Sequence, residues 1–292
     1  LCKLLPYLAA QAMLSVDCEG ADLSKGSWRD GALLDEPGVP MHGRVCLMQI
    51  GTPGGEAYAI DILELGARAF DLGLRRLLEN PAVAKVVHDF RQDADALWHQ
   101  FRVRVRGLFD CQLCDVLMRR LQGHRTTYVL GSARLLSTHG VELITIEGIG
   151  ELTQDQKLAI HARFSEDRHL WERRPLPEDM VQYARADVLP LFTLHKKLVT
   201  ALAATAGGEA TALHLVRVGS DAYASDFASQ RACRCRLCCD AAENARFDGC
   251  RVLSMMAQQV DQATMNRLWR QEDAQPLSQP GPSKFYVNES DE

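Results

Sequence analysis

PLPEDMVQYARADVLPL, residues 175–191, is the stretch from which the fold of this chain is best inferred. Pro177 stands before two carboxylates and predicts a helix start, because proline is tolerated at the first helical position and the positive end of the helix dipole stabilises negative charge. Apolar residues then recur at the spacing of one helical face. These residues are Met180, Ala184, Val188 and Leu191.

Asp187 falls within this apolar face. Tyr183 lies beside it, because a helix turns by about 100° per residue and residues four apart are neighbours. An unpaired buried carboxylate is energetically costly, so we expect a basic side chain or a metal ion to meet Asp187. Pro190 cannot donate a hydrogen bond to the carbonyl of Ala186, and it therefore predicts a kink just after Asp187.

Two further carboxylates, Asp17 and Glu19, lie in a predicted strand at residues 13–19, where apolar and polar residues alternate. Residues two apart on a strand project from the same face, about 7 Å apart along the chain. Two carboxylates this close repel each other unless a cation lies between them. A solvated acidic face is the alternative interpretation of the same pattern.

The segment HDFRQDADAL, residues 88–97, carries three carboxylates at the end of a predicted strand and the start of a predicted helix. On that helix Asp93 lies nearer to the apolar face than Asp89 does. Asp93 is therefore the better candidate to face a cleft, whereas Asp89 is expected to cap the helix.

Four carboxylates from distant parts of the chain are thus candidate ligands: Asp17, Glu19, Asp93 and Asp187. Hard oxygen ligands of this kind suit Mg²⁺ or Mn²⁺. Four carboxylates suffice for two such ions about 4 Å apart, which is the arrangement used in phosphodiester cleavage. The sequence therefore predicts a site for two divalent ions.

Five short motifs follow one another along the chain: Asp-x-Glu (Asp17, Glu19), His-x4-Asp-x3-Leu (His88, Asp93, Leu97), Phe-Asp-x-Gln-Leu (109–113), Trp-x3-Pro-Leu (Trp171, Pro175, Leu176) and Tyr-x3-Asp (Tyr183, Asp187). Their order resembles that of the DEDDy exonucleases. These are ribonuclease D-like 3′→5′ exonucleases with an RNase H-like fold. Through residues 88–93 the chain looks closest to eukaryotic exonuclease-domain-containing and Egalitarian-like proteins.

The resemblance implies that Asp17, Glu19 and Asp187 hold one ion, that Asp17 and Asp93 hold the second, and that Tyr183 orients the attacking water. It implies a 3′→5′ exoribonuclease that acts on single-stranded RNA and releases nucleoside monophosphates. Two alternatives stay open: a catalytically weak or inactive ribonucleoprotein adaptor with the same fold, and a 3′→5′ DNA exonuclease. The chain departs from the family pattern in an insertion at 21–44 and at Cys111, where threonine is more usual.

The remaining pattern predicts an α/β fold with a mixed β-sheet flanked by helices. We expect a short helix at 1–12 interrupted at Pro6, and strands at 13–19, 45–50, 57–62, 84–87 and 103–109, the second and third forming a hairpin. Helices are expected at 68–79 and 91–101, and the chain is expected to be mostly helical from 111 to 204.

A change of pattern near residue 205 predicts an exonuclease domain at 1–205, a small, mostly helical, cysteine-containing extension at 206–274 and a flexible tail at 275–292. The thiols of Cys233, Cys235, Cys238 and Cys239 suffice for a zinc site, although reduced structural cysteines explain them as well. The extension and the loop at 21–44 are candidate contacts for a protein partner.

The net charge of −5 argues against a protein that coats nucleic acid by charge alone. No apolar run reaches the roughly 18 residues needed to cross a bilayer, so no membrane span is expected. Ten cysteines in a chain of this size indicate a reducing, intracellular compartment. Phosphate contacts and solvated faces explain one set of arginines equally well: 102, 104, 106, 163, 168, 173 and 174.

Overall fold

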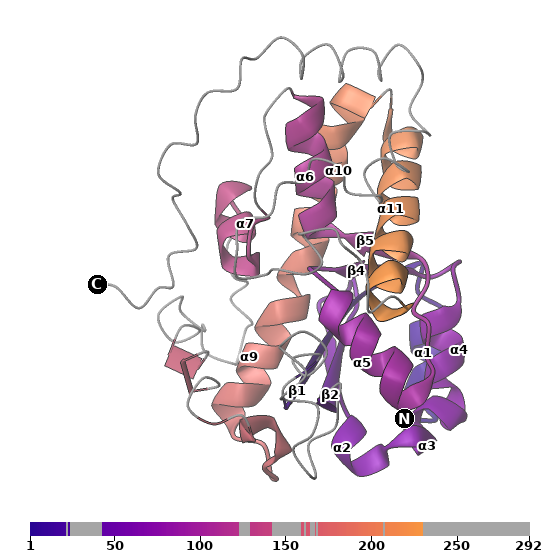
Figure 1. The fold of residues 1–292 in the computed structure, drawn as a ribbon, viewed down its shortest axis with the longest axis vertical. Coiled ribbons are helices and arrows are strands. Elements are labelled where there is room, and N and C mark those ends of the chain that lie inside the picture. Colours follow the sequence, from indigo (N-terminus) through magenta and orange to yellow (C-terminus); the bar gives the residue numbers. More distant parts are fainter. Residues whose placement is uncertain are drawn as a thin grey trace.

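A computed structural model of the protein describes residues 1–21, 23, 43–122, 129–141, 159–160, 162–163, 167, 169–206 and 208–229. Its centre is a five-stranded sheet in the order β3-β2-β1-β4-β5 (Figure 1). β1 runs antiparallel to β2 and parallel to β4, so the predicted mixed sheet is confirmed, and β1 is its central strand. The strands are β1 (Met13–Ala21), β2 (Arg44–Gly51), β3 (Ala57–Asp61), β4 (Ala84–Val87) and β5 (Leu108–Asp110).

Helices cover both faces of the sheet, as predicted (Figure 1). Those before the kink at Pro190 are α1 (Leu4–Ala9), α2 (Ile62–Leu65), α3 (Ala67–Ala69), η3 (Phe70–Leu74), α4 (Arg75–Glu79), α5 (Arg91–Phe101), α6 (Cys111–Leu121), α7 (Ser132–Thr138), η4 (Leu170–Glu172) and α9 (Glu178–Val188). Those after it are α10 (Pro190–Ala206) and α11 (Glu209–Ser229). Within the described residues, no helix is long and apolar enough to cross a bilayer.

Alternation along β1 separates an apolar face from a polar one. Leu14, Val16 and Cys18 are buried in one core together with apolar residues of α1, α4 and α5. The opposite face presents Asp17 and Glu19, both half-buried, toward the side on which α9 packs. The central strand therefore anchors the fold through one face and offers carboxylates from the other.

Three predicted elements need correction. The helix expected at 68–79 is divided, because Gly73 has a positive φ angle of 124° that interrupts a regular helix. The strand expected at 103–109 is wrong for most of its length, since pairing with β4 begins only at Leu108. Pro6 lies in the first turn of α1 and does not interrupt it, because the amide of that position has no partner within the helix.

The kink predicted after Asp187 is confirmed. α9 ends at Val188 and α10 begins at Pro190, whose ring nitrogen carries no hydrogen to continue the ladder. At its other end α9 begins at Glu178, with Pro177 as the N-cap residue.

Asp110, at the end of β5, joins two parts of the chain through its buried carboxylate. Its Oδ1 accepts hydrogen bonds from the backbone N–H groups of Gln112 at 2.9 Å and Leu113 at 3.4 Å, which caps α6. The same carboxylate accepts from the N–H groups of Asp89 at 3.2 Å and Phe90 at 3.3 Å. Asp110 therefore fixes the turn between β4 and α5 as well as the start of α6.

We expect Asp110→Ala to lower the free energy of unfolding by about 3 kcal/mol, because four buried N–H groups lose their acceptor. Urea unfolding followed by circular dichroism measures this loss. Asp71→Ala, at an exposed carboxylate on η3, is the control and is expected to change stability by less than about 0.5 kcal/mol. An equally small loss for Asp110→Ala would contradict the capping role.

Candidate functional site

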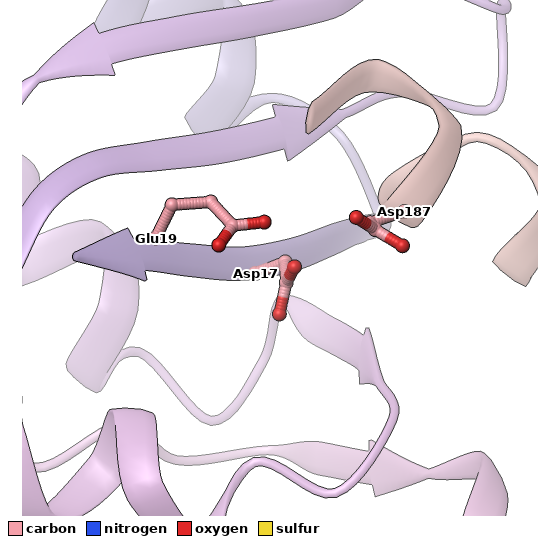
Figure 2. A group of neighbouring side chains, drawn as sticks. All are labelled: Asp17, Glu19 and Asp187. Atoms are coloured by element: carbon pink, nitrogen blue, oxygen red, sulfur yellow. The ribbon is translucent and has the colours of Figure 1, made fainter. Parts of the chain in front are cut away.

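Three carboxylates converge where α9 crosses the acidic face of β1. One oxygen each from Asp17, Glu19 and Asp187 lies within 4.8 Å of the other two. Figure 2 shows Asp17 and Glu19 along β1 and Asp187 on the neighbouring helical turn. All three residues are half-buried. We refer to Asp17, Glu19 and Asp187 as the carboxylate group.

The backbone of β1 places the first two members of this group beyond the end of a neighbouring strand. β4 pairs with β1 only as far as Ser15, so Asp17 and Glu19 extend past it. Regular pairing with β2 shifts after Glu19, where a Cβ atom at Gly20 would lie only 2.0 Å from the carbonyl oxygen of Arg44. Glycine is therefore required at this close approach. Asp17 and Glu19 pair with β2 on one side and extend past the end of β4 on the other.

Helix α9 brings Asp187 to the group and is held over the sheet by Arg174. The guanidinium of Arg174 contacts the carboxylate of Asp61 through Nε at 2.5 Å and Nη2 at 2.7 Å. Asp61 is the last residue of β3, so this bidentate pair ties the segment before α9 to the sheet.

Tyr183 lies one turn before Asp187 and is 8% exposed. Its ring centroid is 6.2 Å from that of Trp171. Burial, followed by the charges of Asp187, Glu19 and Asp17, raises the pKa of the Tyr183 hydroxyl far above its usual range. The phenol therefore stays protonated at neutral pH and can donate a hydrogen bond beside the carboxylate group.

Asp93 lies in the first turn of α5 and is 7% exposed. Burial, followed by the charges of Asp89 and Asp110, raises the pKa of Asp93 to about 8. Burial therefore favours the protonated form of the Asp93 carboxyl group when no metal is bound. The structure brings together three of the four predicted ligands and leaves Asp93 outside the carboxylate group, so its role at a second ion stays a prediction.

Gln49 is a residue of this site that the sequence pattern did not single out. It is the cross-strand partner of Asp17 on β2, and paired residues project from the same face of a sheet. Its side chain is 1% exposed, and neither Oε1 nor Nε2 has a hydrogen-bond partner among the described residues. The only signal in the sequence is a lone amide in the apolar run Val45–Ile50.

The donor atoms of the carboxylate group fit a hard divalent ion. All three ligands are carboxylate oxygens, which suit Mg²⁺ or Mn²⁺ better than a soft metal. Their spacing permits one ion to be shared among them, and such an ion would offset their mutual repulsion. Asp17, Glu19 and Asp187 are therefore the residues that would hold it.

Other candidate residues have structural roles or lie outside the described residues. Trp171 is 3% exposed, so it packs in the core and is not available to stack on a base. Cys111 and Cys114 are buried, and burial raises the pKa of both thiols, which disfavours redox chemistry.

Several of the arginines considered for phosphate contact are paired with carboxylates. Arg163 pairs with Asp179 and Arg173 with Asp167. Arg102 and Arg104 lie over the ring of Trp98, at 5.3 and 4.3 Å from its centroid. Arg168, Cys233, Cys235, Cys238, Cys239 and most of the loop at 21–44 lie outside the described residues, so predictions that concern them remain untested.

The chain is similar in sequence to proteins of known name. The piRNA biogenesis protein EXD1 of Mus musculus is 28% identical over 195 residues, which are 66% of this chain and 30% of the mouse protein. The EXD1 protein of Danio rerio is 33% identical over 163 residues, 55% of this chain and 41% of that protein. The chain thus matches less than half the length of each of these relatives.

The same fold occurs among solved structures. Trypanosoma brucei RNase D superposes with a TM-score of 0.60 at 20% identity, and the match covers 91% of this chain and 77% of that one. This likeness shows a shared RNase D-like, RNase H-like fold, as predicted.

A family model described as 3′-5′ exonuclease matches residues 38–203, which is more than half of the chain. The matched segment includes Asp93, Tyr183 and Asp187, and it begins after β1, which carries Asp17 and Glu19. The sequence match and the fold agree: the chain belongs to the 3′-5′ exonuclease family, with a ribonuclease D-like fold.

Proposed function

We propose that this protein is a metal-dependent 3′→5′ exoribonuclease. The observation that carries the proposal is the carboxylate group, in which residues far apart in sequence converge beside the protonated phenol of Tyr183. The family supports exonucleolytic chemistry. RNA as substrate is supported by relatives named for piRNA biogenesis and ribonuclease D, and by a solved complex of Trypanosoma brucei RNase D with RNA U12.

The proposed reaction is hydrolysis of the last phosphodiester of a single strand. The oxygen of a water molecule bonds to the phosphorus of the phosphodiester that joins the last nucleotide to the one before it. The bond from that phosphorus to the 3′ oxygen of the preceding nucleotide breaks. The departing oxygen takes up a proton, and a nucleoside 5′-monophosphate is released. Two divalent ions, when bound, would stabilise charge on the phosphate and lower the pKa of the attacking water.

The chain's own residues supply the positions for this chemistry. Asp17, Glu19 and Asp187 would hold the first ion, and Asp17 with Asp93 would hold the second. Tyr183 keeps its proton and would donate a hydrogen bond to the attacking water, which fixes the direction of attack.

A second candidate function is that of an RNA-binding adaptor with little turnover. The observation in its favour is Asp93, which is buried and lies outside the carboxylate group. Tight RNA binding without shortening of the RNA in Mg²⁺ or Mn²⁺ would favour this function. A matched DNA oligonucleotide in the same assay tests the alternative of a DNA exonuclease.

We expect Asp17→Asn and Asp187→Asn each to lower the rate of RNA shortening by about a hundredfold or more, because each removes a ligand charge. The double variant should lose little more, since the residues act as a unit. Gel analysis of 5′-labelled RNA in Mn²⁺ measures the rate. Asp71→Asn is the control at an exposed site, and wild-type rates in the Asp17 or Asp187 variant would overturn the proposal.

The pKa of Asp93 predicts a pH dependence of metal binding. Its raised pKa of about 8 means that a proton must leave before the carboxylate can bind a cation below that pH. We therefore expect the apparent affinity for a second Mn²⁺ to rise up to about tenfold per pH unit below pH 8 and to level off above it. Calorimetric titration measures this. Asp93→Asn should abolish the second site, and a flat profile in wild type would contradict the prediction.

Gln49→Met is expected to raise the free energy of unfolding by about 1 kcal/mol, because it replaces a buried amide that has no hydrogen-bond partner among the described residues. The rate of RNA shortening should fall, since the amide lies beside Asp17 and its cost in stability is typical of functional sites. Met48→Leu, on the opposite face of β2, is the control and should leave the rate unchanged. A Gln49→Met variant of wild-type activity would show that the amide has no role in the site.

A further inference from the structure

Helix α11 follows the segment that matches the exonuclease family, yet it packs directly on β5 and on α5, which carries Asp93. The match ends at residue 203, and α11 spans Glu209–Ser229. Figure 1 shows α11 alongside α5, and the two helices are in contact, as are α11 and β5. Leu215, Val216 and Tyr223 are buried in cores shared with α6, α10 and β5.

The first link runs from α11 to β5 through hydrogen bonds. The carboxylate of Asp221 accepts from the backbone N–H groups of Gly107 at 3.1 Å and Leu108 at 2.8 Å. The hydroxyl of Ser220, which is 1% exposed, accepts from the N–H of Asp110 at 2.8 Å. α11 therefore fixes the edge strand whose last residue, Asp110, holds the N–H groups of Asp89 and Phe90.

The second link runs from α11 to the turn between β4 and α5 through Arg91. The Arg91 guanidinium lies 4.9 Å from the centroid of the Tyr223 ring. The same guanidinium donates to Asp89 through Nε at 2.5 Å and Nη2 at 2.8 Å. Arg91 is 6% exposed and Tyr223 is 2% exposed, so this stack is shielded from water. A cation–π contact is strongest when it is shielded in this way.

The turn that these links hold is conformationally strained. Asp89 has a φ angle of 52°, in the left-handed region that residues other than glycine rarely adopt. Such a residue persists only where its surroundings hold it. Arg91 and Asp110 both contact Asp89, and each is in turn held by α11. Asp93 lies two residues after Arg91 on the same helical turn.

From this geometry we infer that α11 is a positioning element for Asp93, the predicted ligand of the second ion, and that Tyr223 acts through Arg91. The inference rests on the proposed function for the identity of the ion. It assigns a role to residues 209–229, outside the matched family segment: they hold the strained turn so that the Asp93 carboxylate is presented in one place. Arg91 and Tyr223 are positioning residues, since they act through the turn.

The test is Mn²⁺ binding to the full chain, followed by calorimetry and electron paramagnetic resonance. In Tyr223→Leu, which removes the ring beneath Arg91, we expect the affinity for the second Mn²⁺ to fall about tenfold while that for the first is unchanged. Tyr223→Phe keeps the ring and should bind both ions as wild type does. In RNA cleavage at limiting Mn²⁺, kcat of Tyr223→Leu should fall, and excess Mn²⁺ should restore it.

A folded Tyr223→Leu protein with both Mn²⁺ affinities unchanged would overturn the inference. If Tyr223→Leu does not fold, Arg91→Lys decides: lysine keeps the charge but loses the planar, two-point contact with Asp89, so it should show the same selective loss. Wild-type protein that binds two Mn²⁺ ions and does not shorten RNA would remove the proposed function while leaving the role of α11 in place.

Discussion

Repulsion among Asp17, Glu19 and Asp187 is the constraint around which the rest of this structure is arranged. Three carboxylates share a half-buried space in which their oxygens lie within 4.8 Å of one another. At 4.8 Å and an effective dielectric constant of about 20, an ionised pair repels by roughly 3.5 kcal/mol, and by less where water screens it. A fold that holds them together must supply the opposing free energy from packing elsewhere, or from a cation that they share.

That opposing free energy comes from the elements that carry the acids. β1 is the central strand, and its apolar residues Leu14, Val16 and Cys18 are buried on the face opposite the carboxylates. α9 is held across the acidic face by Met180, Tyr183 and Ala184, which pack with Trp171 and Leu47 in one core. The carboxylate group is thus supported by two cores, one on each side of the sheet.

Asp93, the fourth predicted ligand, is positioned by a different set of contacts. Asp93 follows a strained turn that depends on Asp110, Arg91 and, through them, on α11. The turn before Asp93 is consequently in contact, through Asp110 and Arg91, with a helix outside the matched family segment.

Local patterns in the sequence determined the order of most elements, the acidic strand, the break at Pro190 and the placement of Asp17 and Glu19 on one face of their strand. Each of these features depends on spacing along a single element. Tertiary contacts decided the rest. Gly73 divided a predicted helix, a strand expected at 103–109 formed only at its end, and Gln49 on β2 came to pair with Asp17 on β1. The burial of Asp93 beside Asp110 and the contact between Arg91 and Tyr223 of α11 depend on packing between distant segments. No periodicity along the chain encodes such contacts.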